Sequence, residues 1–437
     1  MTVREQGSSN KLFYYTRTGP FSTFNMRKEI VLKQQVQVET WTLCVEEVLK
    51  VFPEFAVRPV IKDNRVFYEE NHAAAPVYRR ARTRAFGTED TNGYLFYHLA
   101  DQRRILISFF HGLCDAVGME LFLDCVLYLY GKKSGLLQAE DTIPEIYARR
   151  LEADCPVSLA QLSDEELDPY GFLARTSDPS PNKTPPEGEA FFIPRQEDLV
   201  HSAKVHVYSV HLETGEILAL SKKMGVSLTA LLIPLFGQAI ARSCRAQEET
   251  VRIMLPVNMR PIYGVQTMVN FSDGISFSLD GAMRRESIAV QAGQCLKQLK
   301  ARASRECFDP VLSDNVKTVQ AFERGDTLAE QVEPEPLVSP ERGKHPPFTC
   351  ALTYPRGMRE FSFLSEISYC CAASTSLTAV VYAWQKHMTV RCIQKSDSDA
   401  IVKALAICLE EAGIGARICD EGCMSGDVLL MSRIAKR

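Results

Sequence analysis

The spacing of apolar residues predicts a helix followed by short strands near the start of the chain. Apolar residues recur at helical spacing between Val36 and Val51, and Pro53 follows, so this helix should end near Val51. Residues Ala56–Val60 and Arg65–Tyr68 are short apolar segments with the pattern of strands. The first part of the chain therefore predicts a mixture of helix and sheet.

Two further apolar segments lead into the most informative stretch of the sequence. Tyr94–Leu99 and Ile105–Phe110 predict a hairpin with the polar turn Asp101–Arg104. His111 and Asp115 follow, and then the segment "VGMELFLDCVLYLYG", whose apolar residues are interrupted only by Glu120 and Asp124 and which should stop at Gly131. A helix that is apolar nearly all round lies inside a protein. The His111–Asp115 pair is therefore expected at a strand-to-helix turn near the middle of the molecule.

The character of the chain changes between about Pro144 and Pro194, where "TSDPSPNKTPPEGE" is polar and rich in proline. This composition predicts a linker or excursion between two halves. The second half begins with a strand near Val205, and its further predicted elements are helices at Gly215–Met224, Ser227–Arg242, Glu286–Ala303 and Asp399–Ala412 and strands at "VRIMLPVNMR", Phe348–Tyr354, Phe361–Ala373 and Thr378–Ile393. Ser227 should cap its helix, the last strand should fold back at Gln385–His387, and Asp309–Pro346 is expected to be irregular.

Composition narrows the function classes. The chain has 437 residues, 46% hydrophobic and 24% charged, which is ordinary globular usage and allows two or three domains. The net charge of −4 gives no signal for nucleic-acid binding. The N-terminus lacks the apolar core of a signal peptide, and the longest apolar runs are too short to span a bilayer. Fourteen cysteines in such a chain indicate reduced thiols, and we expect a cytoplasmic protein with no membrane span.

No group of residues has the spacing of a metal site. Cys419 and Cys423 are not spaced as zinc ligands, and His201, His206 and His211 are five apart, which puts neighbours on opposite faces of a strand. Cys114 lies beside His111 in a tight turn, where its thiol cannot readily align with the imidazole as a nucleophile. No bound metal is therefore predicted.

The His111–Asp115 pair has two readings. Its spacing alone decides little, but a histidine with an ordinary pKa near ~6.5 can act as a base at neutral pH, and a buried aspartate would need a cationic partner. In the alternative reading, His111 is a core histidine bonded to backbone carbonyls and Asp115 caps the next helix. The position of the pair at a strand end favours the functional reading.

At this point the sequence resembles a known superfamily. "FFHGLCDAVGMELFL" resembles the HxxxD signature of the chloramphenicol acetyltransferase-like acyltransferases, which include condensation domains of peptide synthetases, plant BAHD acyltransferases and alcohol acetyltransferases. "LPVNMRPIYGVQTMVNFSDGISFSL", Leu255–Leu279, resembles a second segment found in alcohol acetyltransferase-like members, and the two motifs occur in the expected order. The resemblance covers most of the chain in layout but only ~40 residues in motif.

The resemblance implies roles for particular residues. His111 matches the catalytic base, Asp115 matches a structural aspartate turned away from substrate, and Arg260 matches the arginine that pairs with it. Gly112, with Gly118, would allow close backbone approach, although each could equally be a turn glycine. Asn270 and two residues of "STSLT", Ser374 and Ser376, are candidates for binding substrate or the oxyanion, although a turn or strand-edge role explains each more simply.

The resemblance also implies a fold. It is an α/β structure of two lobes, each a mixed sheet backed by helices, with a tunnel between them and His111 near its middle. Residues 1–195 would form the N-terminal lobe, ending in a proline-rich linker at about 175–195, and residues 196–437 would form the C-terminal lobe carrying "VNMR". Small acceptor and acyl thioester would enter from opposite faces.

Three departures from the family pattern limit the inferred activity. Ala116 replaces the usual glycine after the aspartate, Phe110 replaces the first histidine of the condensation-domain motif, and a DFGWG segment is absent. The expected function is transfer of an acyl group from acyl-CoA, a co-substrate and not a tightly bound cofactor, to a hydroxyl or amine. The alternatives are a condensation enzyme that uses an acyl or peptidyl carrier protein as donor, and a degenerate member that only binds a ligand or partner.

Overall fold

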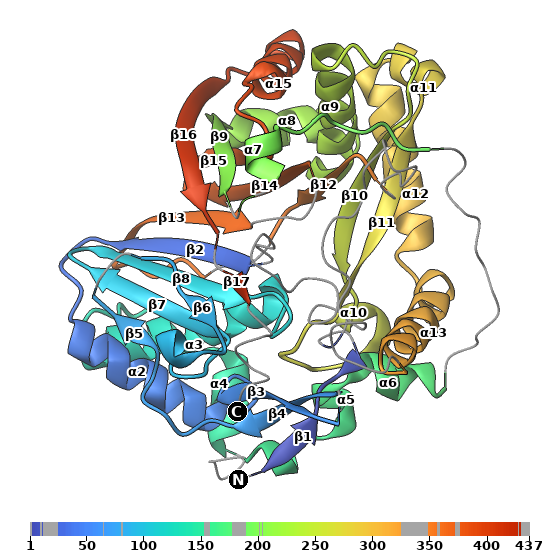
Figure 1. Cartoon of the computed structure of the whole chain (residues 1–437). Coiled ribbons are helices and arrows are strands. Elements are labelled where there is room, and N and C mark those ends of the chain that lie inside the picture. Colours follow the sequence, from blue (N-terminus) through green and yellow to red (C-terminus); the bar gives the residue numbers. More distant parts are fainter. Residues whose placement is uncertain are drawn as a thin grey trace.

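The structure is a computed structural model of the full chain. It describes residues 2–8, 11, 25–63, 65–79, 82–152, 158–176, 189–200, 202, 204–324, 348–355, 359–371, 376–426 and 428–429. Two large sheets, each with helices packed against it, form two lobes (Figure 1). The architecture is therefore the mixed α/β structure that the sequence predicts.

The sheet of the N-terminal lobe has five strands in the order β13-β2-β8-β7-β5. Its members are β13 (Leu364–Cys371), β2 (Asn25–Leu32), β8 (Arg104–Phe110), β7 (Phe96–Asp101) and β5 (Val77–Tyr78). Strands β7 and β8 form the predicted hairpin, and Gln102 in its turn has a positive φ of 48°. Strand β13 comes from the second half of the chain and pairs antiparallel with β2. The first lobe is thus completed by a strand that lies far away in the sequence.

The sheet of the C-terminal lobe has seven strands in the order β11-β10-β12-β14-β15-β9-β16. Its members are β11 (Ser272–Leu279), β10 (Val251–Asn258), β12 (Cys350–Thr353), β14 (Leu377–Trp384), β15 (His387–Gln394), β9 (Lys204–Glu213) and β16 (Arg417–Ser425). Strands β14 and β15 form the predicted hairpin with its turn at Gln385 and Lys386. Strand β16, which the sequence pattern did not predict, lies at the edge of this sheet (Figure 1).

Helices cover the sheets, because the apolar faces of the helices and of the sheets are then buried against each other. In the N-terminal lobe, α2 (Val38–Val51) packs against α3 (Ala116–Lys133), and both contribute to the first hydrophobic core. In the C-terminal lobe, α9 (Leu228–Ser243) lies between α12 (Ile288–Arg302) and α15 (Ala400–Glu411), and its residues are almost all buried in the second core. Ser227 caps α9 as predicted, with its Oγ accepting from the Ala230 backbone N–H at 3.2 Å.

Shorter elements connect the lobes and extend their edges. Strands β1 (Val3–Glu5), β4 (Arg65–Glu70) and β3 (Val57–Lys62) form a small antiparallel sheet, and β17 (Val428–Leu429) pairs with β6 (Ala85–Phe86). The remaining helices are η1 (Glu89–Thr91), α4 (Glu145–Glu152), η2 (Leu159–Gln161), α5 (Asp164–Leu167), α6 (Pro169–Ala174), α7 (Glu197–Val200), α8 (Thr214–Lys223), α10 (Arg260–Tyr263), α11 (Gly281–Arg285) and α13 (Arg305–Phe322).

Two sequence predictions are wrong in ways that packing explains. Helix α3 does not stop at Gly131 but continues to Lys133, and a Cβ at Gly131 would lie 2.6 Å from Leu137 and 2.7 Å from Phe363. Leu137 and Phe363 therefore leave no room for a side chain at position 131. The segment expected to be irregular contains most of α13, which runs to Phe322 with Pro310 in its second turn. Phe308 and Leu312 are buried in the second core and hold this helix in place.

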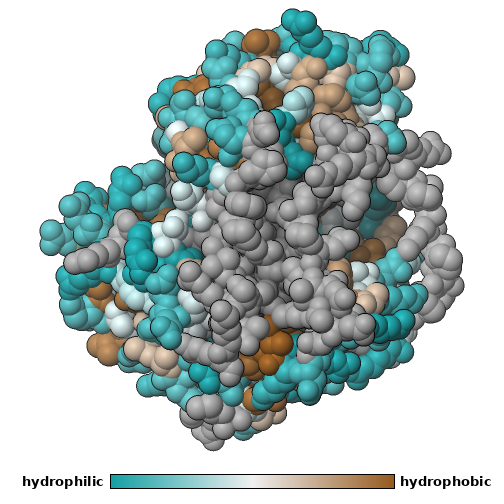
Figure 2. Space-filling view, viewed as in Figure 1, coloured by the Kyte–Doolittle hydropathy of each residue, from teal (hydrophilic) through white to brown (hydrophobic). Residues whose placement is uncertain are grey.

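The expected lobes, residues 1–195 and 196–437, each supply most strands of one sheet, with β13 as the exception. Part of the segment from about Pro144 to Pro194 is structured, because α4, α5 and α6 lie within it and Tyr170 of α6 is buried in the second core. Residues 177–188, most of the linker expected at about 175–195, lie outside the described residues. Figure 2 shows that hydrophilic residues dominate the coloured parts of the visible face. In the described part of the chain, no single helix has the length and apolar character needed to cross a bilayer.

Candidate active site

His111 lies at the end of β8, one residue past the last strand position and five residues before α3 begins. The turn Gly112–Asp115 reverses the chain, and Leu113 and Cys114 within it are fully buried. The His111 side chain itself is only partly buried. A rigid strand and a buried helix therefore hold the imidazole at a point where it keeps some accessible surface.

Asp115 caps α3 and also accepts hydrogen bonds from the other lobe. Its Oδ1 accepts from the Gly118 backbone N–H at 3.0 Å, which is an N-cap bond, and its Oδ2 accepts from the Phe271 backbone N–H at 2.9 Å. Arg260 donates to both carboxylate oxygens, at 2.7 Å from Nη1 and 3.0 Å from Nη2. The pairing of Asp115 with Arg260 that the two motifs predict is therefore present, and it joins the two lobes beside His111.

Arg260 begins the short helix α10 directly after β10. Its Nε donates to the Thr267 carbonyl at 2.7 Å, its Nη2 to the Val269 carbonyl at 2.7 Å, and its Nη1 to Asn258 Oδ1 at 3.2 Å. With the two bonds to Asp115, all five N–H donors of the guanidinium have acceptors. Arg260 therefore fixes the loop 267–271 and the Asp115 turn, and it has no donor left for a substrate.

Gly118 allows α3 to approach the loop of the other lobe. A Cβ at this position would lie 2.0 Å from the Met268 carbonyl oxygen, which is an impossible contact for any side chain. The sequence left open whether Gly118 was a close-approach or a turn glycine. It is a close-approach glycine, and its small size lets the Phe271 N–H reach Asp115.

The charges of the site follow from burial. Burial lowers the pKa of His111 below 6.5, although the nearby Asp115 carboxylate and a backbone hydrogen bond oppose this shift. Burial alone would raise the pKa of Asp115, but the Arg260 charge and hydrogen bonds lower it below its usual range. The His111 imidazole is therefore neutral at neutral pH, and Asp115 is ionised. Cys114 is fully buried and burial raises its pKa well above 9.0, so its thiol is a poor nucleophile.

Glu120 and Asp124, the two acidic residues within the otherwise apolar part of α3, are both buried. Lys28 Nζ lies 2.5 Å from Glu120 Oε2, and the Tyr369 hydroxyl of β13 donates to Glu120 Oε1 at 2.6 Å. Burial, with the charge of Glu120, raises the pKa of Asp124 to about 7. Glu120 therefore belongs to the packing of α3 against β2 and β13.

The other predicted site residues have different outcomes. The Gly112 carbonyl accepts from the Tyr68 hydroxyl at 3.2 Å, and the buried Asn270 accepts from Ser272 Oγ at 3.2 Å and precedes the Phe271 N–H that binds Asp115. Ser376 is buried directly before β14, where the chain has crossed from the sheet of one lobe to that of the other. Ser374 lies outside the described residues. None of these contacts tests their roles in binding, which stay predictions.

Sequence reasoning missed the backbone groups that complete the site. The carbonyls of Thr267 and Val269 and the N–H of Phe271 all meet the Asp115–Arg260 pair. Their side chains carry no signal of this contact, because any residue offers the same backbone atoms. The only sequence cue was the proximity of this loop to "VNMR".

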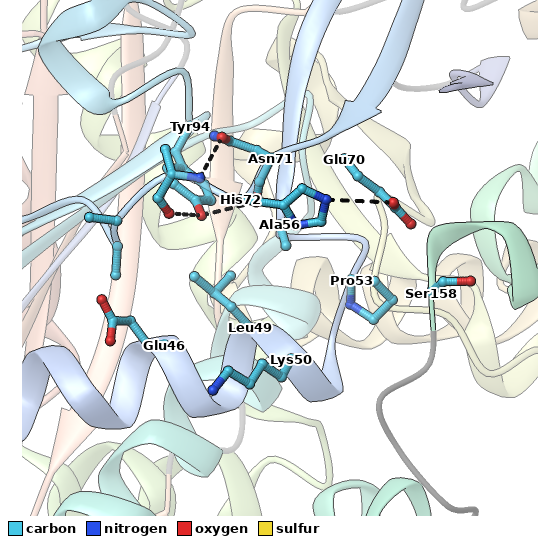
Figure 3. Close-up of a pocket in the computed structure, with 13 residues that line it drawn as sticks. Glu46, Leu49, Lys50, Pro53, Ala56, Glu70, Asn71, His72, Tyr94 and Ser158 are labelled. Carbon is cyan, nitrogen blue, oxygen red and sulfur yellow. Dashed lines mark hydrogen bonds and ion pairs between the residues drawn. The ribbon is translucent and has the colours of Figure 1, made fainter. Parts of the chain in front are cut away.

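One cavity flanks this region and a second lies apart from it. One of about 620 Å³ lies between the lobes beside Arg260, and its wall includes Asp124, Arg149, Gln266 and Arg359. Another of about 560 Å³ opens between α2 and the segment after β4, where Figure 3 shows Leu49 of the helix on one side and Asn71 and His72 on the other. His111 does not line either cavity. The first cavity shares Arg260 with the site, and the second is separate from it.

Comparison with known proteins gives matches in structure alone. No protein-family sequence model matches the chain, and no curated protein is similar to it in sequence. Polyketide synthase associated protein 5 from Mycobacterium tuberculosis is 12% identical over 93% of this chain and 97% of its own, with a TM-score of 0.61. F. sporotrichioides TRI101, complexed with coenzyme A and T-2, is 9% identical over 96% and 100%, also with a TM-score of 0.61.

A third similar structure is a mutant of the starter condensation domain of rhizomide synthetase RzmA in complex with C8-CoA and Leu-SNAC. It is 12% identical over 94% of this chain and 95% of its own, with a TM-score of 0.58. All three matches cover nearly the whole length of both chains, so the likeness includes both lobes and their arrangement. The chain therefore has the two-lobed fold of these three structures, which include a condensation domain.

Proposed function

We propose that the protein is an acyltransferase that moves an acyl group from a thioester, acyl-CoA in the first instance, to a hydroxyl or amine of a small acceptor. The observation that carries this proposal is the placement of His111. It is partly exposed, neutral at neutral pH, and held at the junction of the lobes by the Asp115–Arg260 pair. The fold and the complexes of two similar structures with CoA or an acyl-CoA support the same reaction class.

In the proposed reaction, a nitrogen of His111 accepts the proton of the acceptor hydroxyl or amine as that atom attacks the thioester carbonyl carbon. A bond forms between acceptor and acyl carbon, and the carbonyl oxygen becomes an oxyanion. The carbon–sulfur bond then breaks, and the protonated imidazole returns the proton to the leaving thiolate. Asp115 and Arg260 are positioning residues in this scheme, because every donor of Arg260 already has an acceptor.

The binding groups remain part of the proposal. Asn270, Ser374 and Ser376 are the candidates for stabilising the oxyanion or contacting substrate, and Gly112 is the backbone position beside the base. A donor of this kind contributes on the order of 3 kcal/mol to catalysis. Alanine at the correct position should therefore lower kcat about a hundredfold, with little change in KM for the thioester.

The test is thiol release from acetyl-CoA and longer acyl-CoA thioesters with a panel of small alcohols and amines. Wild-type protein should release CoA only when an acceptor is present, and His111→Ala should reduce kcat at least about a hundredfold. His387→Ala is the matched control, because that histidine is 68% exposed on β15 and should leave the rate unchanged. Equal activity of wild type and His111→Ala would overturn the role of His111.

The same assay identifies the acyl donor. Turnover of free acyl-CoA supports the proposed donor, and turnover only of thioesters attached to a carrier protein supports a condensation-type enzyme. If no thioester of either kind is consumed while an acyl-CoA still binds in calorimetry, the protein is a binding member of the superfamily and the catalytic proposal fails.

A further inference from the structure

Three side chains outside the candidate active site meet between the strands β9 and β16 at the edge of the C-terminal sheet. Cys423 Sγ lies 3.6 Å from His206 Nδ1, and His206 Nε2 lies 2.8 Å from Asp420 Oδ1. A thiol, an imidazole and a carboxylate are thus arranged in a row. This order of groups is the arrangement in which a base activates a nucleophile and an acid orients the base.

An irregularity in β16 brings these groups to one face. Cys423 is the register partner of His206, and Asp420 is the partner of Tyr208. Residues three apart on a regular strand point to opposite faces, so Asp420 and Cys423 could not both reach His206. The register shifts between Asp420 and Gly422, and Gly422 has a φ of 78°, which glycine adopts without strain. This bulge turns both side chains toward the same imidazole.

The two contacts define the state of the ring. Asp420 has a lowered pKa, mainly because the Gly422 backbone N–H and then His206 bind its carboxylate, so it accepts a hydrogen bond from Nε2–H. In the neutral ring, Nδ1 then carries the lone pair and faces the thiol. The lone pair is therefore in position to accept the Cys423 proton, and the carboxylate stabilises the imidazolium that results.

The surroundings hold the ring but leave the sulfur accessible. His206 is 9% exposed and stacks on Tyr208 with ring centroids 4.5 Å apart. Cys423 is exposed. The carboxylates of Asp397 and Asp399 lie near Tyr208 and add negative charge on this face, and Glu421 turns to the opposite face, where it pairs with Arg391 at 2.8 Å. The imidazole is therefore held in place beside an accessible thiol.

We propose that Cys423 is a modification site that reacts with low-molecular-weight disulfides. His206 takes the thiol proton, and the Cys423 sulfur attacks one sulfur of the disulfide. A new S–S bond to Cys423 forms, the disulfide's own S–S bond breaks, and its second half leaves as a thiolate that takes up the proton. Cys423 is oxidised to a mixed disulfide, and the other half of the reagent is reduced.

The test compares Cys423 with Cys419, a half-buried cysteine on the same strand whose side chain alternates to the other face. Full-length protein is incubated with oxidised glutathione, and the tryptic peptide that follows Arg417 is analysed by mass spectrometry. Cys419→Ser and Cys423→Ser variants leave one thiol each in this peptide. Cys423 should react at least about tenfold faster than Cys419, with the largest difference at pH values below about 8, where an unassisted thiol is protonated.

Two further variants measure how much His206 and Asp420 contribute to the reaction rate of Cys423. His206→Phe keeps a ring to stack on Tyr208 but removes both nitrogens, and it should reduce the Cys423 rate to that of Cys419. Asp420→Asn keeps a side-chain oxygen that can accept from His206 Nε2–H but removes the negative charge. The imidazolium is then less stable, so the pH–rate profile of Cys423 should shift to lower pH. The rate should fall by less than it does in His206→Phe. Equal rates of Cys423 and Cys419 in wild type, or no effect of His206→Phe in a variant with a wild-type melting curve, would overturn the proposal.

Discussion

At the scale of single residues, one buried carboxylate determines the shape of the candidate active site. Asp115 accepts four hydrogen bonds, two on each oxygen, and Arg260 donates five. Their side chains are only 4% and 9% exposed. Burying both charges is tolerable because each satisfies the other, and losing one partner leaves the other charge buried and unpaired.

This dependence makes a prediction for stability. Arg260→Met should lower the free energy of unfolding by about 3–5 kcal/mol, because it leaves Asp115 ionised and buried. The double variant Asp115→Leu with Arg260→Met should cost less than the sum of the two single changes, since it removes both charges. Denaturant unfolding followed by circular dichroism measures this coupling.

The control is an arginine–carboxylate ion pair of similar length at the surface. Arg242 on α9 binds Glu411 on α15 at 2.8 Å, with both side chains about half exposed. Arg242→Met should cost less than about 1 kcal/mol. If Arg260→Met is as mild as this control, the buried pair does not hold the lobes together.

The pKa of His111 gives a prediction for pH dependence. Burial holds this pKa below 6.5, so the base stays unprotonated as the pH falls through 6.5. The acid limb of kcat/KM for acyl transfer should therefore lie below pH 6.5, with activity lost only when the pH drops through the lowered value. Asp115 opposes the shift, so Asp115→Asn should move the limb to still lower pH in the activity that remains. An acid limb above pH 6.5 would contradict the assignment of His111.

At the scale of elements, the sequence predicted the parts whose pattern is local. The helix after Asp115, the hairpins β7–β8 and β14–β15 and the Ser227 cap follow from periodicity, turn residues and capping chemistry. Most of helix α13 lies in the segment that was expected to be irregular, and β16 was missed because its polar, bulged edge lacks a strand's alternation. His111 and Asp115 stood out as polar residues between apolar segments, and the pairing of Asp115 with Arg260 was implied by the resemblance of the two motifs to the acyltransferase superfamily. The side chains of loop 267–271 gave no such cue for its backbone partners.

Gly118 tests how closely α3 must approach the opposite lobe. Gly118→Ala places a Cβ 2.0 Å from the Met268 carbonyl, so α3 and the loop must separate and the Phe271–Asp115 bond must weaken. We expect loss of several kcal/mol in stability and a large drop in kcat. Gly293→Ala in α12 is the control: nothing lies within 4 Å of its Cβ, and alanine should stabilise the helix by about 0.5–1 kcal/mol. Equal melting temperatures for the two variants would show that the close approach is unimportant.

At the scale of the whole molecule, β13 makes the lobes interdependent. It lies next to β2 in the N-terminal sheet, and the chain then passes into β14 of the C-terminal sheet. Phe361, Phe363, Leu364, Ile367 and Tyr369 from this segment are buried in the first hydrophobic core. The N-terminal lobe therefore cannot bury its core or cover the edge of β2 from its own half of the chain.

A fragment that ends at residue 200 should consequently fail to fold. It would expose the backbone groups of β2 along one edge together with the apolar surface that β13 covers, and both features promote aggregation. The same fragment followed by a flexible linker and residues 359–371 should be more soluble and show a cooperative thermal transition. Static light scattering and circular dichroism distinguish these outcomes. A cooperative transition in the shorter fragment would show that the N-terminal half is an autonomous domain that folds without β13.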